Sequence, residues 1–275
     1  MTSAEPRRLL LVHAHPDDES ITTGGVMARY AAGGAEVTLV TCTLGEEGEI
    51  IPPELDGLGS WASDQLGGYR VGELAAACAA LGVTRQRYLG GIGRWRDSGM
   101  ADAGVNHPRA FTAGALDEQV AQLAEILDEV RPQVVVTYDA FGGYGHPDHI
   151  RAHEITTAAV GGTGARLFHI AASEQATKRG LAELRERADL GFRIAEDGEL
   201  PTTPDAEITT SIDITGHLGA KISALRAHAT QVSVPDGANC FALSNGIAQP
   251  LPPAECFVHA GGSAEGVSTD LFGGL

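Results

Sequence analysis

Two short clusters of histidine and aspartate carry the side chains best suited to chemistry. The segment 15–18 (HPDD) directly follows the apolar run 9–12, and the segment 146–149 (HPDH) follows the apolar run 134–138. Imidazole nitrogens and carboxylate oxygens are ligands that Zn²⁺ and Fe²⁺ both accept in proteins. The two clusters therefore predict one metal site built from two loops, and they indicate a metal-dependent hydrolase.

A catalytic zinc site needs about three protein ligands and one open position for water. His15 and Asp18 lie three residues apart in a tight turn that contains proline, so both can face one ion. His149 can supply the third ligand at the start of the helix that follows the second cluster. Two histidines and one carboxylate suit Fe²⁺ as well as Zn²⁺, so the ligand set leaves the choice of metal open.

Three further side chains in or next to the clusters have acid, base or hydrogen-bonding chemistry. Asp17 neighbours a predicted ligand without being needed as one, which makes it a candidate general base for a metal-bound water. His146 is a candidate acid or oxyanion partner, and Tyr144 offers a phenol to the same cavity. These three residues predict a hydrolysis in which side chains beside the metal donate and accept the protons.

Helix capping is the main alternative explanation for the acidic residues. Asp17 and Asp18 could cap a helix that follows them, and Asp148 could cap the helix that begins at His149. Capping alone does not readily explain two H-P-D segments that each follow a strand. We therefore favour the metal site.

The hydrophobic pattern predicts alternating strands and helices. Residues 9–13 form an apolar strand, residues 22–32 a helix that ends at a glycine pair, and residues 36–43 a β-branched strand. This βαβ unit implies a parallel sheet with a right-handed crossover. The pattern also predicts strands at 87–89, 134–138 and 166–171 and helices at 69–81, 116–130, 149–160 and 214–230.

These elements predict an α/β fold, a Rossmann-like doubly wound and mostly parallel sheet with helices on both faces. In such sheets ligands bind beyond the carboxyl ends of the strands, where both clusters lie. We expect a single domain over residues 1–275, with a core at about 8–175 and an irregular C-terminal extension at about 176–275 that wraps it. The loop at 90–108 is long enough to be functional.

Composition narrows the partners and the compartment. The chain has 275 residues and a net charge of −17, which argues against nucleic acid and anionic membranes as partners. It has no apolar run near the ~20 residues of a membrane span, and residues 1–8 precede too short an apolar stretch for a signal peptide. The four cysteines form no C-x-x-C pair, which favours the cytoplasm, although a Cys240–Cys256 disulfide stays open.

Six segments carry a family resemblance. Residues 13–19 (HAHPDDE) and 143–149 (GYGHPDH) resemble the LmbE-like, PIG-L superfamily of zinc-dependent N-acetylglucosaminyl deacetylases. The likeness to the actinobacterial branch that acts in mycothiol biosynthesis extends to 41–49 (TCTLGEEGE), 64–70 (DQLGGYR), 93–100 (GRWRDSGM) and 225–231 (LRAHATQ). It covers most of residues 8–160 and part of the C-terminal third.

The resemblance implies roles at the metal. His15, Asp18 and His149 would hold one Zn²⁺ per subunit, with Fe²⁺ as the alternative. Asp17 would be the general base, and His146 would protonate the leaving amine or stabilise the oxyanion. Tyr144, on a mobile loop at 142–145, would polarise the substrate carbonyl.

The resemblance also implies a binding site for an amino-sugar inositol. Arg70 and Asp97 would hydrogen-bond the sugar or inositol hydroxyls, and Met100 would line the pocket. Ser20 and Glu47 are further candidates for this pocket. Asp148 would orient His146, or it would cap the following helix.

The implied reaction converts N-acetylglucosaminyl-inositol to glucosaminyl-inositol and acetate during mycothiol biosynthesis. One alternative is a mycothiol S-conjugate amidase, a branch with a Lys after its H-P-D-D-E-S segment; residues 21–23 (ITT) contain none. Another LmbE-like N-acetyl sugar deacetylase is a further alternative. A nucleotide-binding Rossmann module is disfavoured because the first strand is not followed by G-x-G-x-x-G. The sequence makes no prediction of the oligomeric state.

Overall fold

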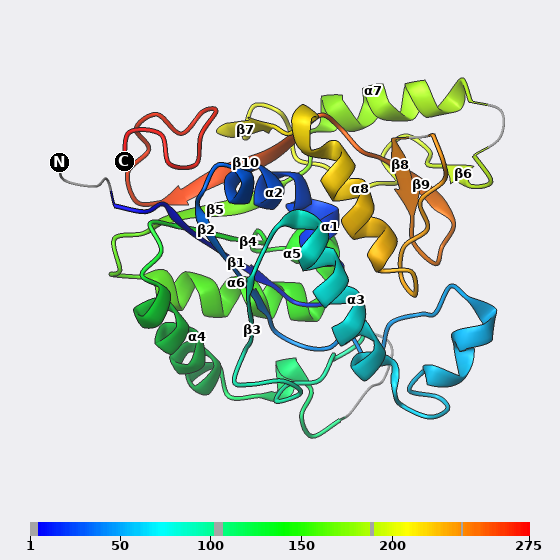
Figure 1. Ribbon diagram of the computed structural model, residues 1–275, viewed down its shortest axis with the longest axis horizontal. Coiled ribbons are helices and arrows are strands. Elements are labelled where there is room, and N and C mark those ends of the chain that lie inside the picture. Colours follow the sequence, from blue (N-terminus) through cyan, green and yellow to red (C-terminus); the bar gives the residue numbers. More distant parts are fainter. Residues whose placement is uncertain (1–4, 102–106, 188–189, 238) are drawn as a thin grey trace.

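A seven-stranded sheet forms the centre of the protein, in the order β3-β2-β1-β4-β5-β10-β7 (Figure 1). The computed structural model describes residues 5–101, 107–187, 190–237 and 239–275. Residues 102–106 of the loop expected at 90–108 lie outside these ranges. The strands of the sheet are β1 (Arg8–His13), β2 (Glu36–Thr41), β3 (Arg85–Tyr88), β4 (Val134–Thr137), β5 (Arg166–Ala171), β7 (Thr210–Asp213) and β10 (Ala254–Gly261).

Five of these strands are parallel, as the sequence predicts. Leu9 in β1 is in register with Val37 in β2 on one side and with Val134 in β4 on the other. The chain winds outward from β1 to β2 and β3, then crosses back to β4 and β5 on the other side. The sheet is therefore doubly wound, and the winding direction changes between β1 and β4, where such sheets bind their ligands.

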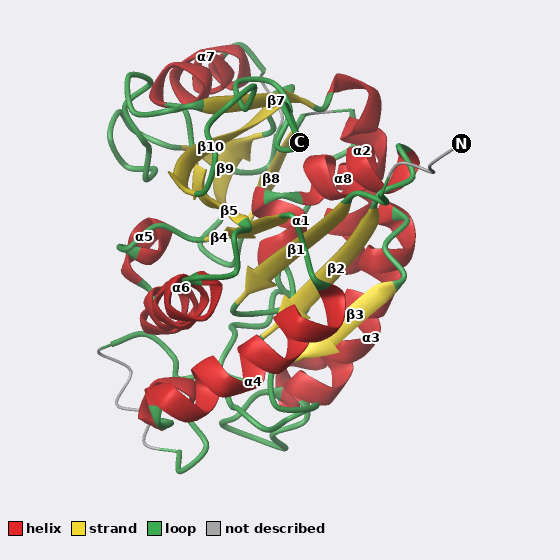
Figure 2. Ribbon diagram, turned by 90° about the vertical axis from the view of Figure 1, so that its left-hand side faces the viewer, coloured by secondary structure: helices red, strands yellow, loops and turns green. Residues whose placement is uncertain are grey.

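Helices cover both faces of the sheet and explain the continuous apolar sequence of β1 (Figure 2). Leu9 and Leu11 point into a core shared with α2, α3 and α8, whereas Leu10 and Val12 point into a core shared with α4 and α6. These four side chains of β1 are fully buried. The helices are α1 (Asp18–Thr22), α2 (Gly24–Ala32), α3 (Leu66–Leu81), α4 (Leu116–Val130), α5 (Gly142–Gly145), α6 (Pro147–Val160), α7 (Glu174–Arg185) and α8 (Leu218–Ala227).

Four helix predictions need correction at their ends. The helix expected at 69–81 already begins at Leu66. The helix expected at 22–32 is two helices, because Thr23 has φ −134° and separates α1 from α2. The helix expected from His149 already begins at Pro147, since proline suits the first turn of a helix. The helix expected at 214–230 spans only Leu218–Ala227 and follows a 3₁₀ turn at Thr215–His217. Two more 3₁₀ turns occur at Pro53–Leu58 and Phe111–Ala113.

The C-terminal part contains more regular structure than its sequence predicts. Strand β10 runs antiparallel between β5 and β7 inside the main sheet. A small second sheet has the order β6-β9-β8, with β6 at Arg193–Ile194, β9 at Ile247–Pro250 and β8 at Cys240–Ala242. The charged helix α7 was also not predicted. The extension therefore supplies a strand to the main sheet as well as covering it.

All four cysteines are free thiols, so the possible Cys240–Cys256 disulfide is not formed. Cys42 and Cys78 are buried, as their apolar surroundings predict. Among the described residues, no helix is long and apolar enough to cross a membrane.

Candidate metal centre and active site

The ends of β1 and β4 bring the two histidine clusters together. His15 Nδ1 lies 3.4 Å from Asp18 Oδ2 and 3.3 Å from His149 Nε2. His149 Nε2 in turn lies 3.3 Å from Asp18 Oδ2. We call these three atoms the donor triangle; their side chains are all buried.

The shape of the donor triangle fits one metal ion. In a tetrahedron with sides of about 3.35 Å, the centre lies about 2.05 Å from each corner, which matches the bond lengths of zinc to imidazole and carboxylate. The triangle is one face of such a tetrahedron, and two imidazoles with one carboxylate are a common donor set for zinc and iron. The described residues therefore form a His/His/Asp metal-binding cluster.

Hydrogen bonds fix which nitrogen each histidine presents to the triangle. His149 Nδ1 lies 3.1 Å from the carbonyl oxygen of Gly142, so this nitrogen carries the proton and Nε2 keeps its lone pair. His15 Nε2 lies 3.2 Å from Asp148 Oδ2, which leaves Nδ1 free in the same way. Such outer carboxylates and carbonyls orient metal-bound histidines and raise their basicity.

Asp18 is held as an acceptor by its neighbours. Its Oδ2 accepts the backbone N–H of His15 at 2.9 Å and the hydroxyl of Tyr138 at 2.8 Å. Burial alone would raise the pKa of this carboxyl group, but His149 and His15 hold the pKa well below its usual range. Tyr138 also stacks on the His149 ring, with centroids 4.2 Å apart. The carboxylate is therefore charged and fixed in direction.

Asp17 has an unusual backbone conformation, with φ 119° and ψ −36°. Its Oδ2 accepts a hydrogen bond from Arg70 Nη2 at 3.0 Å, and its N–H donates to Glu19 Oε2 at 2.9 Å. Burial raises the pKa of Asp17 to about 6, although Arg70 acts in the opposite direction. The carboxyl group beside the donor triangle is thus a mostly buried group with an enhanced affinity for a proton.

His146 lies against the donor triangle and caps helix α6. Its ring centroid is 4.6 Å from that of His15 and 5.0 Å from that of His149. Its Nδ1 accepts the backbone N–H of Asp148 at 3.1 Å, so a neutral ring carries its proton on Nε2. Burial lowers the pKa of His146 to about 3, with the other two histidines acting in the same direction.

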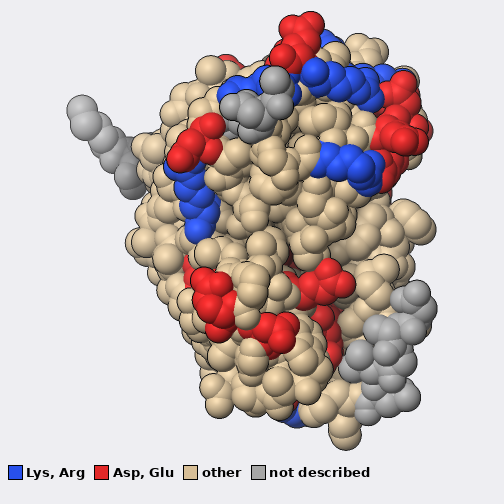
Figure 3. Space-filling view, turned by 90° about the vertical axis from the view of Figure 1, so that its right-hand side faces the viewer, with Lys and Arg blue, Asp and Glu red and all other residues tan. Residues whose placement is uncertain are grey.

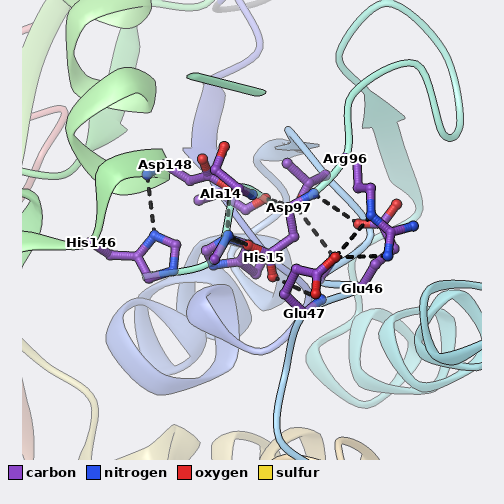
Figure 4. Close-up of polar contacts among 12 residues, drawn as sticks. Ala14, His15, Glu46, Glu47, Arg96, Asp97, His146 and Asp148 are labelled. Carbon is purple, nitrogen blue, oxygen red and sulfur yellow. Dashed lines mark hydrogen bonds and ion pairs between the residues drawn. The ribbon is translucent and has the colours of Figure 1, made fainter. Parts of the chain in front are cut away.

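Asp148 differs from both sequence-based expectations. Its carboxylate faces His15, not His146, and it accepts the backbone N–H of Ser98 at 3.0 Å (Figure 4). The cap of α6 is the His146 ring. Asp148 is the first acid inside the helix, so its side chain points back across the helix start to β1. Asp97 Oδ1 lies on the same side of His15, 3.5 Å from its Nε2.

Tyr144 lies on a helical turn where the sequence predicts a loop. The turn α5 is held by Asp139 Oδ1, which accepts the N–H groups of Phe141 and Gly143 at 3.0 and 2.9 Å. The Tyr144 ring stands edge-on to His149 with centroids 5.0 Å apart, and half of the residue is exposed. Its phenol therefore reaches the donor triangle from the solvent side.

The residues expected to bind substrate are mostly engaged inside the protein. Arg70 donates to the carbonyl oxygens of Gly45 and Pro16 as well as to Asp17. The Glu47 carboxylate accepts hydrogen bonds from Arg96 and from Ser60. Figure 4 shows this Arg96–Glu47 pair beside Asp97.

The remaining predicted substrate residues differ in exposure. Asp97 Oδ1 accepts the N–H of Gly99 at 2.8 Å, and the residue is buried. Ser20 is fully buried, with its hydroxyl on Glu19. Met100 is 44% exposed and borders solvent.

Four residues at the site were missed from the sequence: Glu19, Arg96, Tyr138 and His228. Glu19 is the last residue of the HPDDE segment, and His228 lies in the LRAHATQ segment, so both had a motif signal. Glu19 and His228 form a buried pair, with Glu19 Oε1 2.7 Å from His228 Nε2. Tyr138 ends an apolar run and had no signal beyond its strand position.

Known proteins resemble the chain over its whole length. A deacetylase from Actinosynnema mirum, named 1D-myo-inositol 2-acetamido-2-deoxy-alpha-D-glucopyranoside deacetylase, is 65% identical over 100% of this chain and 99% of its own. A protein of the same name from Mycobacteroides abscessus is 53% identical over 98% of both chains. Both relatives match nearly the whole of this chain and nearly the whole of their own length.

A solved structure and a family model also carry the names of deacetylases. N,N'-diacetylchitobiose deacetylase from Pyrococcus horikoshii superposes with a TM-score of 0.54 at 22% identity, covering 84% of this chain and 72% of that one, which shows a shared fold. The model of the PIG-L family, described as GlcNAc-PI de-N-acetylase, matches residues 10–160. These residues include both histidine clusters and the whole donor triangle. The chain belongs to the PIG-L, GlcNAc-PI de-N-acetylase family.

Proposed function

We propose that this protein removes the acetyl group from N-acetylglucosaminyl-inositol, releasing acetate and glucosaminyl-inositol, in the biosynthesis of mycothiol. One observation carries the proposal: a chain 65% identical to a deacetylase named for this substrate forms the donor triangle, and the Asp17 carboxyl group is near enough to Asp18 and His15 for their charges to affect its pKa. The reaction is hydrolysis of an amide bond, which needs an activated water, a base and a donor for the oxyanion.

We assign zinc to the donor triangle, with His15, Asp18 and His149 as its ligands. Bound there, zinc supplies Lewis acidity, which lowers the pKa of water and polarises the acetamide carbonyl. The second nitrogen of each histidine is already hydrogen-bonded, to Asp148 and to Gly142, so both rings already turn their other nitrogen toward the donor triangle.

Asp17 is the base in this proposal. Arg70 holds its Oδ2, which leaves Oδ1 to accept a proton from the attacking water. When the C–N bond breaks, the proton on Oδ1 passes to the amine nitrogen, so the carboxylate is regenerated. A carboxylate that receives and returns one proton balances the hydrolysis without a second acid.

His146 is the oxyanion donor. Because its Nδ1 accepts the Asp148 N–H, its Nε2–H is the free donor of the neutral ring. A preformed N–H aimed at the carbonyl oxygen favours the tetrahedral state, in which that oxygen carries the most charge. The Tyr144 phenol, over His149, is placed to support the same oxygen from the solvent side.

The charge of the protein favours an uncharged sugar over a lipid-linked one. The net charge is −17, and Figure 3 shows a face on which Asp and Glu prevail in the lower half while Lys and Arg lie mainly in the upper half. N-acetylglucosaminyl-inositol is neutral, whereas a phosphatidylinositol derivative carries a phosphate and sits in an anionic surface that repels this protein. The free cysteines suit a cytoplasmic enzyme.

Metal removal and one matched variant test the proposal. We expect chelation to abolish amine release from N-acetylglucosaminyl-inositol and Zn²⁺ to restore it. Asp17→Asn, which tolerates a positive φ and keeps the side-chain shape, should lower kcat by about 10²- to 10⁴-fold while one Zn²⁺ per chain remains bound. Asp128→Asn, at an exposed position of α4, is the control and should retain full activity. Turnover that survives complete metal removal would contradict the mechanism.

A bulky mycothiol S-conjugate is the competing substrate. It presents the same type of amide bond, so the donor triangle alone does not separate the two activities. We expect a higher kcat/KM for N-acetylglucosaminyl-inositol than for an S-conjugate measured with the same preparation. The reverse order would assign the protein to the amidase branch.

A further inference from the structure

The backbone at Asp17 is strained and needs support. Asp17 has φ 119°, a conformation that non-glycine residues rarely adopt. Such a residue persists only where its surroundings fix it. Three hydrogen bonds do so here: Asp17 N–H to Glu19, Arg70 to Asp17 Oδ2, and Arg70 to the carbonyl oxygen of Pro16.

The first support depends on a residue of the C-terminal extension. The Glu19 carboxylate is fully buried and uses Oε2 to accept the Asp17 N–H. Its Oε1 lies 2.7 Å from Nε2 of His228, which is also fully buried and directly follows α8. If the His228 donor were removed, the Glu19 carboxylate would still be charged and buried. The Ser20 hydroxyl would then be the side-chain donor left to it. The rotamer of Glu19, and hence the position of its Oε2, is set by His228.

The second support is tied to the same segment. Thr230 donates its N–H and its hydroxyl to the two oxygens of Glu73, at 2.8 and 2.7 Å. Glu73 lies three residues beyond Arg70 on α3, so the two side chains share one face of that helix. Residues 228–230 therefore contact both groups that flank Asp17: Glu19 directly, and the helix of Arg70 through Glu73.

We propose that His228 is a positioning residue for the deacetylation: through Glu19 it holds Asp17 in the strained conformation that presents Oδ1 to the substrate. The C-terminal extension then contributes to catalysis, because His228 fixes the orientation of the Asp17 carboxylate without touching the substrate. The proposal rests on the proposed function in one respect, the assignment of Asp17 as the base.

Steady-state kinetics distinguish positioning from bulk stability. His228→Leu keeps the volume but removes the donor, and a base displaced by about 1 Å costs about 10- to 100-fold in rate. We expect this loss in kcat, with KM within about twofold of wild type and the zinc stoichiometry unchanged. His228→Gln, whose amide can donate to Glu19, should recover most of the loss.

Arg166→Met is the matched control. Arg166 is buried, but it lies at the start of β5, at the opposite end of the sheet from the active site. Its loss should lower the free energy of unfolding and leave kcat within about twofold of wild type. If Arg166→Met lowers kcat as much as His228→Leu does, the effect is general destabilisation and the proposal fails.

Hydrogen exchange on the metal-free protein tests the geometry without substrate. We expect faster exchange of the amides at 15–20 in His228→Leu and near wild-type exchange there in His228→Gln and Arg166→Met. Unchanged exchange in this segment, or unchanged kcat, would overturn the proposal. If the wild-type protein does not release amine, the proposed function fails, and the exchange result still decides whether His228 fixes Asp17.

A second variant keeps the test open if His228→Leu does not fold. Glu19→Gln preserves the side-chain size, but its amide has one acceptor oxygen for three donors: the Asp17 N–H, the His228 Nε2–H and the Ser20 hydroxyl. We expect a loss of kcat of about tenfold, with faster exchange at 15–20. Wild-type kcat in folded Glu19→Gln would remove the proposed link between His228 and Asp17.

Discussion

At the scale of single residues, each histidine of the donor triangle has its second ring nitrogen held by a hydrogen bond. His149 uses the Gly142 carbonyl oxygen, and His15 uses the Asp148 carboxylate. These acceptors orient both rings so that Nδ1 of His15 and Nε2 of His149 face the donor triangle. Asp148 has the larger influence of the two acceptors, because a carboxylate increases the electron density on the ring more than a carbonyl does.

Asp148→Asn should weaken zinc binding. Asparagine keeps an oxygen for His15 Nε2–H but removes the negative charge, and such outer partners are worth about 10- to 100-fold in metal affinity. We expect the dissociation constant for Zn²⁺, measured by competition with a chelator, to rise by about tenfold, and by about 100-fold for Asp148→Ala. Asp128→Asn serves as the control. An unchanged constant in Asp148→Ala would show that His15 needs no carboxylate.

The donor triangle could be predicted from the sequence, whereas its supports could not. His15 and Asp18 follow strand β1, and His149 lies in the first turn of helix α6, which comes after β4. The parallel sheet brings the ends of these two strands together. The direction of the Asp148 side chain depends on where α6 starts, which the sequence misplaced by two residues. The Glu19–His228 pair joins positions 209 residues apart, so no local pattern reveals it.

At the scale of elements, the start of α2 is capped by a side chain from β10. The residue before the helix, Thr23, makes no side-chain cap, and the Glu255 carboxylate accepts the N–H groups of Gly25 and Val26 at 2.9 and 2.7 Å. Lys221 of α8 donates to Glu255 at 2.6 Å and to the carbonyl oxygen of Ile21. One buried ion pair therefore joins α1, α2, α8 and β10.

Lys221→Met should destabilise the protein by about 3–5 kcal/mol, because it leaves the Glu255 charge buried and uncompensated. The double variant Lys221→Met/Glu255→Gln should lose less than the single one, since no charge then remains buried. Urea unfolding measures both free energies. The exposed pair of Lys178 and Glu174 provides the control, and Lys178→Met should leave the midpoint unchanged within error. A single variant as stable as wild type would contradict the assigned role.

The contact between β5 and α6 makes stability depend on pH. Burial lowers the pKa of His169 to about 4, and the neighbouring His153 ring, 4.8 Å away, acts in the same direction. The unfolded chain titrates near 6.5, so between pH 6.5 and 4 it binds a proton that the folded protein does not. The free energy of unfolding should therefore fall as the pH falls through this window.

His169→Asn measures this contribution. Between pH 7 and pH 4, we expect the wild type to lose about 1–2 kcal/mol more of its free energy of unfolding than the variant loses. The difference is this small because the His169 ring is partly exposed. Thermal unfolding at several pH values is the measurement. If the variant and the wild type show parallel pH dependences, His169 is not responsible.

Elements with a strong local pattern were predicted, and those defined by distant partners were not. Helix α4 has the predicted bounds of 116–130 because its apolar residues repeat at helical spacing. The break at Thr23 was missed, since the cap that starts α2 comes from Glu255. Helix α7 was missed because it is mostly polar and charged, and only Leu181 and Leu184 are buried on it.

At the scale of the whole molecule, Arg166 of β5 binds three carbonyl groups of the C-terminal residues. Arg166 is 1% exposed and donates to the carbonyl oxygens of Glu265, Leu271 and Gly273. Leu271 and Phe272 lie in the core cluster shared with β1, α2 and α3. The end of the chain is thus part of the main core, which the irregular sequence of residues 232–275 does not suggest.

Deleting residues 262–275 should therefore unfold the protein. The deletion removes Leu271 and Phe272 from the core, each worth about 2–5 kcal/mol, which together approach the stability of a typical domain. Arg166→Met, which only removes the three hydrogen bonds, should cost about 2–3 kcal/mol. Circular dichroism and thermal unfolding distinguish the two outcomes. A folded and cooperative truncated chain would show that the tail is dispensable.

The placement of β10 has a consequence for how the chain folds during synthesis. Strands β1 to β5 are complete by residue 171. Strand β5 pairs with β4 on one side, but its partner on the other side is β10, which begins only at residue 254. A growing chain therefore carries an open edge on β5 until residues 254–261 have left the ribosome. Open strand edges are templates for pairing with other chains. The protein depends on its last strand to close that edge, and we expect translation stalled before residue 254 to yield aggregation-prone intermediates.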